Sequence, residues 1–309
     1  MIGRLLVCAA GAFLSVGLLI PAVPRYVTGP LGQQAGMVGV SLAVTAVAGV
    51  LARPLAGRVA DRAGRRTALR GVAGIGEALA YVGLATLASD HRRLGLTLPK
   101  TMSADTESAS PDPGTRRARL YHTSALRPGF GYLASVWGYT AISAFLPLHL
   151  AALGGSGGLH FLAYGGVLVA IRLAGYRLLA TAAPTRLAVT SLLLTGTGSI
   201  LLAAWPSPAG TWCAIALIGA GQGLGLPAFL RMAVHGLPAR ERGSAVATTT
   251  AFFDIGFLTA ALALGALADR FGLAGGFALA GVVSAAGALL FLPVRHHEHE
   301  GAPLDRSPR

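Results

Sequence analysis

The feature that most constrains this chain is a succession of apolar segments, each close to the length of a membrane-spanning helix. A bilayer core about 30 Å thick is crossed by about 20 residues of α-helix. Nine segments approach that length, at residues 5–23, 36–52, 71–89, 129–151, 159–180, 187–205, 211–230, 245–267 and 273–294. We therefore expect an all-α polytopic membrane protein with about nine hydrophobic segments.

Composition and charge support this class and exclude others. Only 12% of the residues are charged, against about 25% in a typical soluble domain. The formal net charge is +13, but the charges lie in short clusters between apolar segments. Such clusters are typical of basic cytoplasmic loops, so we expect no nucleic-acid partner. Cys8 and Cys213 both lie inside apolar segments, which argues against a disulfide framework.

One long polar stretch divides the chain. Residues 91–127 are rich in Ser, Thr, Pro and mixed charges, a composition typical of a flexible linker. We expect a shorter transmembrane part over 1–90 with three helices, the linker over 91–127, a six-helix part over 128–295, and a cytoplasmic tail over 296–309. The apolar N-terminus has no clear signal-peptidase site, so a first membrane helix is preferred to a signal peptide.

The distribution of arginine predicts the orientation. Six basic residues lie between Arg53 and Arg70, with Asp61 as the only acid among them. Basic loops stay in the cytoplasm, so this loop and the N-terminus are predicted to be cytoplasmic. The longer part is also predicted to begin and end in the cytoplasm. Three complete spans before the linker would place the linker outside the cell, so the two predictions conflict. Either 71–89 does not fully cross, since Glu77 lies at its centre, or the second part is inverted, or the chain is a shortened version of a larger protein. We favour the first and third explanations together.

The loop itself carries a motif. GRVADRAGRR, residues 57–66, resembles the signature loop of the major facilitator superfamily (MFS), G-x-x-x-D-R/K-x-G-R/K-R/K, which lies between that family's second and third helices. The matching residues are Gly57, Asp61, Arg62, Gly64, Arg65 and Arg66. FLPLHLAALG (145–154) resembles the repeated first helix of the family's second half, and LPARERGSAVATTTAFFDIG (237–256) resembles the entry to its eleventh helix.

The resemblance implies a secondary transporter of bacterial efflux type. Such proteins have two six-helix halves, a central cavity and alternating access. Helices four to six are absent from this sequence, and LGLTLPKT (94–101) resembles the exit of a sixth helix. In the family, the network around the residue matching Asp61 is taken to latch the two halves at the cytoplasmic side. The other interpretation of these residues is a basic anchor that fixes topology.

Asp254 and its neighbour Phe253 lie in FFDIG, inside an apolar span. An acid at that depth is costly, so a functional or paired role is the first hypothesis. Asp254 could carry a proton or bind a cationic substrate group. It could equally be a hydrogen-bonded structural residue near the signature loop.

Three further residues are candidates for a substrate cavity. Trp137 and Tyr139 lie on one helix and could line a cavity for an amphiphilic molecule. Gln222, in GAGQGLGLP, could bind substrate or hydrogen-bond a neighbouring helix. GALADRFG (265–272) repeats part of the signature pattern at the predicted outer face, and we interpret it as a turn and a helix end.

These observations predict an exporter of a small molecule, a drug or a sugar, driven by the proton gradient in a bacterial inner membrane. The alternative is a truncated remnant or membrane interaction protein that transports nothing. We expect no enzyme, because no acids or histidines cluster as a membrane metal site would need. No cofactor is expected, since no G-x-x-x-x-G-K-[ST] loop is present, and HHEHE (296–300) is read as a solvated tail without metal. The expected partners are the bilayer, a substrate of unknown identity and protons.

Overall fold

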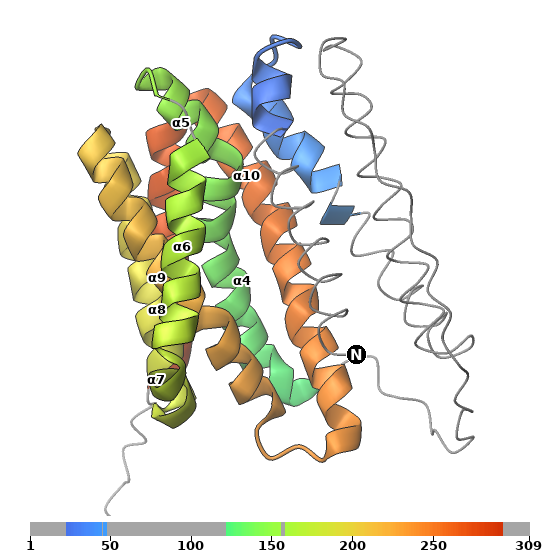
Figure 1. Cartoon of the computed structure of the whole chain (residues 1–309). Coiled ribbons are helices and arrows are strands. Elements are labelled where there is room, and N and C mark those ends of the chain that lie inside the picture. The colour runs from blue at the N-terminus through green and yellow to red at the C-terminus, as the bar shows by residue number, and fades with distance from the viewer. Residues whose placement is uncertain (1–22, 45, 48–121, 156–157, 293–309) are drawn as a thin grey trace, which may run out of the picture.

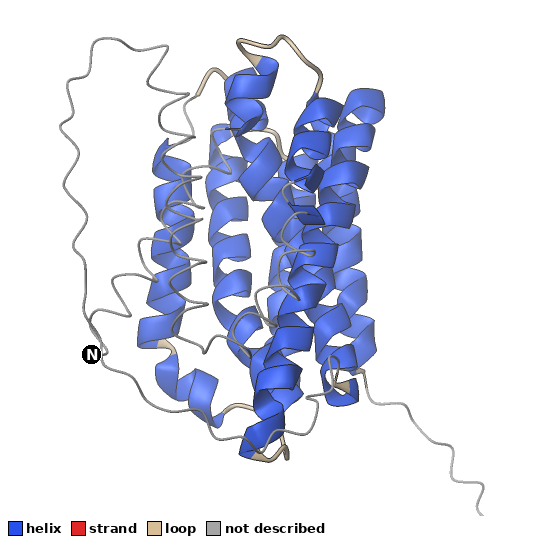
Figure 2. Cartoon of the chain, turned by 90° about the vertical axis from the view of Figure 1, so that its right-hand side faces the viewer, coloured by secondary structure: helices blue, strands red, loops and turns tan. Residues whose placement is uncertain are grey.

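The computed structural model describes residues 23–44, 46–47, 122–155 and 158–292, and all regular elements among them are helices (Figure 2). The predicted first and third spans, the signature loop, most of the linker and the tail lie outside these residues. Residues 23–28 form a short helix, and a longer apolar helix runs over Ala35–Val44. The predicted class, an all-α polytopic membrane protein, is confirmed.

The second part of the chain is a bundle of long helices that run up and down past one another (Figure 1). In order they are η1 (Thr123–Ala125), α4 (Leu126–Thr140), η2 (Ala141–Phe145), α5 (Leu146–Ala152), α6 (Gly158–Ala174), α7 (Tyr176–Thr181), α8 (Pro184–Ala204), α9 (Pro208–Val234), α10 (Ala239–Gly287) and η3 (Ala288–Phe291). Among the residues that the structure describes, four runs are long and apolar enough to cross a membrane: Thr123–Ala152, Pro184–Ala204, Pro208–Val234 and Glu241–Phe291. Of the six spans predicted after the linker, five fall mostly on these runs, and 159–180 falls on α6 and α7.

The helix α10 is two helices joined at a sharp turn. Gly272 has φ 73° and ψ 173°, a conformation that residues with a Cβ atom rarely adopt. The chain reverses there, and the two arms, 239–271 and 273–287, contact each other near the turn, where a Cβ atom on Gly276 would lie 3.4 Å from the Leu264 carbonyl oxygen. At 1.5 Å per residue, the 51 residues of Glu241–Phe291 reach about 77 Å, enough for two crossings. The predicted break between 267 and 273 is therefore located at Gly272.

The first of these spans changes its helical pitch near the middle. Ala141–Phe145 form a π-helical turn between α4 and α5, and Pro147 follows in the first turn of α5. Proline has no N–H to donate and its ring crowds the preceding turn. The wider π turn accommodates this defect, so the span continues to Ala152 without a break.

Small residues let the helices approach closely. A Cβ atom on Gly219 of α9 would lie 3.0 Å from the Tyr164 carbonyl oxygen of α6, and one on Gly223 would lie 2.9 Å from Ile171 Cβ. Gly219 and Gly223 therefore form the close contact between α6 and α9. In lipid the hydrophobic effect hardly favours contact between helices, so the close approach of their backbones supplies much of the packing energy.

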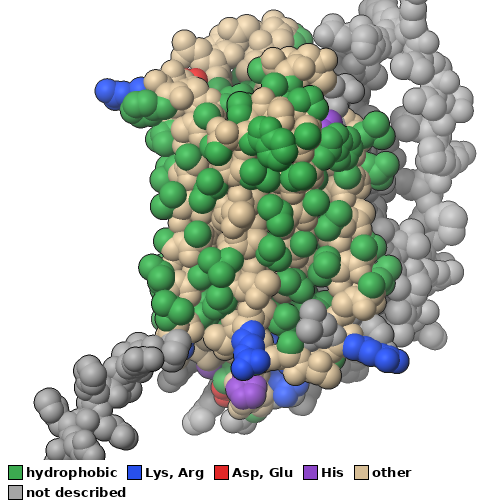
Figure 3. Space-filling view, turned by 90° about the vertical axis from the view of Figure 1, so that its left-hand side faces the viewer, with side chains coloured by type: hydrophobic (Ala, Val, Ile, Leu, Met, Phe, Trp, Pro, Cys, Tyr) green, Lys and Arg blue, Asp and Glu red, His purple; other side chains and the backbone are tan. Residues whose placement is uncertain are grey.

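Charged side chains occupy the ends of the bundle. In Figure 3 the wall is hydrophobic or uncharged, and most of the Lys and Arg side chains visible lie at the lower end. The described arginines at the predicted cytoplasmic loops are Arg127, Arg177, Arg186, Arg231 and Arg242. This arrangement is what a bilayer requires of a helical bundle, because charges are costly only at apolar depth.

Candidate functional site

Aromatic rings from three helices meet on the inner side of the bundle. The Tyr132 ring of α4 lies 5.8 Å from the Phe229 ring of α9 and 5.7 Å from the Phe253 ring of α10. Tyr139, two turns along α4, lies 5.8 Å from Phe253 and 6.4 Å from Phe257. The structure thus brings together the predicted cavity residues Tyr139 and Phe253. We call these five residues the aromatic cluster.

One residue of α6 packs beside this cluster. Tyr164 is partly buried against the hydrophobic core that includes Tyr132 and Phe229. Arg172 follows eight residues later, so its side chain leaves α6 about 80° around the helix from that of Tyr164. The sequence analysis singled out neither Tyr164 nor Arg172. The signal it missed was the depth of Arg172, well inside the apolar segment 159–180.

Trp137 lies away from the aromatic cluster. It is two residues from Tyr139, which corresponds to about 200° around an α-helix. The two side chains therefore leave α4 in nearly opposite directions. The indole Nε1 of Trp137 is buried and has no hydrogen-bond partner among the described residues. The prediction that Trp137 lines the same cavity as Tyr139 stays a prediction.

Gln222 joins three helices. Its Nε2 donates hydrogen bonds to the Ser135 carbonyl oxygen and to Ser135 Oγ, each at 3.0 Å, and approaches Thr195 Oγ1 at 3.5 Å. The side chain is 9% exposed. These contacts hold α9 against α4 and α8, and they occupy the amide N–H groups that a substrate would need.

Asp254 is 8% exposed and lies on a face of α10 beside Phe257 of the aromatic cluster, which follows three residues later. It shares that face with Ala261 and Gly265, at i+7 and i+11. The helix Ala35–Val44 packs against the same face, since the Gly265 position lies 3.2 Å from the Cα atoms of Gly36 and Gly39 when a Cβ is added. Asp254 therefore lies on the side of α10 that contacts the N-terminal part of the chain.

A second carboxylate joins the two parts of the chain directly. Asp269 Oδ1 accepts a hydrogen bond of 2.9 Å from the backbone N–H of Gly36, although 233 positions separate them. Gly36 lies in the first turn of the helix Ala35–Val44, where N–H groups lack helical partners and the helix dipole favours an anion. The sequence predicts only a turn at GALADRFG, and the turn at Gly272 agrees with it. No local signal indicated that Asp269 caps another helix.

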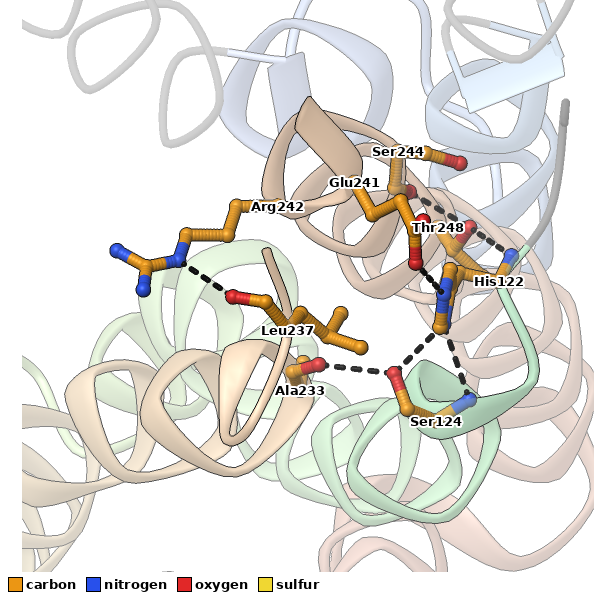
Figure 4. Close-up of polar contacts among 8 residues, drawn as sticks. All are labelled: His122, Ser124, Ala233, Leu237, Glu241, Arg242, Ser244 and Thr248. Carbon is orange, nitrogen blue, oxygen red and sulfur yellow. Dashed lines mark hydrogen bonds and ion pairs between the residues drawn. The ribbon is translucent and has the colours of Figure 1, made fainter. Parts of the chain in front are cut away.

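At the other end of the bundle, side chains tie α4, α9 and α10 together (Figure 4). The His122 Nδ1 accepts from the Ser124 N–H at 3.3 Å, and its Nε2 lies 3.4 Å from Glu241 Oε2. Ser124 Oγ donates to the Ala233 carbonyl at 2.9 Å, and the His122 N–H donates to Thr248 Oγ1 at 3.1 Å. This network fixes the starts of α4 and α10 to the end of α9.

The remaining predicted residues cannot be placed. Gly57, Asp61, Arg62, Gly64, Arg65 and Arg66 lie outside the described residues. Within the part of the chain that the structure describes, no three His, Cys, Asp or Glu side chains gather as a metal site.

Comparison with known proteins agrees with the resemblance of the signature loop. The sequence model described as Major Facilitator Superfamily matches residues 129–307. An uncharacterized MFS-type transporter of Burkholderia mallei (strain SAVP1) is 26% identical over 358 residues, covering 90% of this chain and 88% of the relative. An uncharacterized MFS-type transporter of Pseudomonas aeruginosa (strain LESB58) is 25% identical over 370 residues, covering 94% and 92%. A bundle of apolar helices with this family match over more than half its length is a multi-pass membrane protein, and the chain belongs to the major facilitator superfamily.

Proposed function

We propose that this protein is a secondary-active transporter that exports a small molecule across a bacterial inner membrane by alternating access, driven by the proton gradient. The observation that carries the proposal is the contact between the helix Ala35–Val44 and α10. It combines backbone packing at Gly39 and Gly265 with the single hydrogen bond from Gly36 to Asp269. In this proposal the contact opens and closes during transport.

The position of this contact supports a gate at the outer end. Asp269 lies just before the turn at Gly272, in the predicted outer loop, while the basic loops lie at the opposite end. The signature loop, with Asp61, is predicted at that opposite, cytoplasmic end. Alternating access needs one closable contact at each end, and the two carboxylates Asp269 and Asp61 are suited to these roles.

Asp254 is the candidate for proton coupling. It is a buried acid at membrane depth, on the α10 face that the N-terminal part covers. The surroundings of a carboxylate there change when the N-terminal part and the six-helix part of the chain move relative to each other. Coupling of protonation to conformation requires such a change. The alternative is a structural role in holding that interface.

A second candidate function is a remnant that transports nothing. The alignment spans 358 positions but includes only 90% of this 309-residue chain, so roughly 80 aligned positions have no counterpart here. At about 20 residues per span and with short loops, 80 positions correspond to about three helices. This favours the predicted absence of helices four to six. A cavity wall made by those helices would be missing, unless another chain supplies it.

Flux measurements separate the two functions. The full chain is reconstituted in liposomes loaded with a pH-sensitive dye, a pH gradient is imposed, and panels of small carboxylates, amines and sugars are added. A transporter gives substrate-dependent proton flux, and Asp254→Asn abolishes the proton component while leaving substrate exchange. Thr250→Ala, on the same helix, is the matched control. Absence of flux with every panel, in protein that is folded and oriented, would favour the remnant.

A further inference from the structure

Polar side chains hold together the junction where η1, the end of α9 and the start of α10 meet at the predicted cytoplasmic end (Figure 4). The apolar part of this junction is small. Ala125, Ala233 and Ala245 are fully buried there, and Val234 and Leu237 pack beside them. Alanine side chains bury little apolar area, so hydrogen bonds contribute a large share of the free energy that joins the three elements.

Three of the polar contacts form a chain through the His122 ring. The ring Nε2 lies 3.4 Å from Glu241 Oε2, and Nδ1 lies 2.7 Å from Ser124 Oγ. Ser124 Oγ in turn lies 2.9 Å from the carbonyl oxygen of Ala233, in the last turn of α9. The Leu237 N–H would bond this carbonyl in a longer helix, but it donates to the following carbonyl instead. The Ser124 hydroxyl is therefore the donor that satisfies the end of α9.

The number of protons on the ring decides which of these contacts are hydrogen bonds. A serine hydroxyl has one proton to donate, and an ionised carboxylate only accepts. When both ring nitrogens of His122 are protonated, Nε2–H donates to Glu241 and Nδ1–H donates to Ser124 Oγ. The serine hydroxyl then donates to the Ala233 carbonyl, and all three contacts are satisfied.

A neutral ring cannot satisfy the whole chain. With its one proton on Nε2 and shared with Glu241, the His122 Nδ1 is an acceptor that takes the proton of the Ser124 hydroxyl. The Ser124 N–H, 3.3 Å from Nδ1, also donates to the ring only in this form. The fully buried Ala233 carbonyl then loses its donor, and the bond between η1 and α9 is lost.

One acid, Glu241, contacts the imidazole ring. The other described charged or titratable groups near η1 are directed elsewhere. Arg242 of α10 and Arg127 of α4 donate to backbone carbonyl groups at 3.0 and 2.8 Å. Arg231 of α9 donates to carbonyl groups at the end of α7, and His235, just after α9, is exposed. In the described part of the chain, the proton on Nδ1 is therefore the variable that changes this network.

We propose that His122, Ser124 and Glu241 form a proton-operated latch at this end of the bundle. Protonation of His122 completes the hydrogen-bond chain and holds η1 against both α9 and α10, whereas loss of the proton withdraws the bond to α9. The latch adds regulation by cytoplasmic pH to the proposed transport function, and it rests on that function only for its effect on transport. Its proton dependence is testable without flux.

The test compares Ser124→Ala with the parent at about pH 5.5 and about pH 8, a range that spans the ordinary titration of imidazole. The full chain is unfolded by heat in detergent micelles at each pH. Ser124→Ala should lower the midpoint by about 2–4 °C at the acidic pH, because it removes the bond to α9, and by less at the alkaline pH. Thr248→Val is the matched control. It removes the bond of 3.1 Å from the His122 backbone N–H, which does not titrate, so its shift should be equal at both pH values.

Two further measurements assign the effect to the ring. In a His122→Gln background, the shift caused by Ser124→Ala should no longer depend on pH. Nuclear magnetic resonance of ¹⁵N-labelled histidine in the parent, with His122 assigned by its loss in His122→Gln, should show Nδ1 gaining its proton between the two pH values. Equal Ser124→Ala shifts, a larger shift at the alkaline pH, or a ring whose proton count does not change would overturn the proposal. A latch with this pH dependence in protein that shows no flux would leave the proposal standing and refute transport.

Discussion

Removing the carboxylate of Asp269 should open the outer end of the protein. The Asp269 Oδ1 to Gly36 hydrogen bond is 2.9 Å long and exposed. A hydrogen bond to a charged group contributes about 1.5–3 kcal/mol when sheltered, and an anion at a helix N-terminus about 0.3–1 kcal/mol. Exposure reduces both, so we take about 1 kcal/mol in total. Since about 1.4 kcal/mol is tenfold in an equilibrium, Asp269→Ala should raise the open-to-closed ratio about fivefold.

Thiol accessibility measures this ratio. A single cysteine replaces Tyr139 in the aromatic cluster, with Cys8 and Cys213 changed to serine, and intact cells are labelled with an impermeant maleimide. The labelling rate should rise about fivefold in Asp269→Ala and less in Asp269→Asn, whose amide oxygen still accepts. Arg270→Gln, which removes the adjacent exposed charge, should have no effect. A rate in Asp269→Ala equal to or below that of the parent would refute the gate.

Three further predictions test the packing around the site. Gly39→Val should open the outer end more strongly than Asp269→Ala, because the new side chain overlaps the Ala261 carbonyl oxygen. An overpacked contact of this kind costs about 1–3 kcal/mol. An unchanged labelling rate of the cysteine that replaces Tyr139 would contradict this prediction. Gln222→Met should lower the melting temperature, at about 0.6 kcal/mol per interhelical hydrogen bond lost, without reducing substrate-dependent flux. An unchanged melting temperature with reduced flux would instead make Gln222 a substrate ligand. His122→Ala should destabilise the end of the bundle by about 1 kcal/mol, and Glu241→Gln by less, each measured as a lower midpoint of thermal unfolding. Midpoints equal to that of the parent would show that the network does not contribute to stability.

The sequence alone determined the class of this protein and the limits of most of its helices. The length of an apolar segment is a local property, and the bilayer converts it directly into a span. The six spans predicted after the linker accordingly fall on α4 to α10 and η3. The motif at residues 57–66 indicated the family, which the match over 129–307 then supported independently.

The tertiary structure decided which residues share a site. Whether a side chain meets the aromatic cluster depends on how far its helix is rotated, and apolar segments rich in Gly and Ala carry little periodicity to show it. Tyr139 and Phe253 were predicted and meet, whereas Trp137 leaves α4 on another side. The Asp269 contact joins positions 233 residues apart, and no local pattern encodes such a contact, because it exists only when two distant helix ends are packed together.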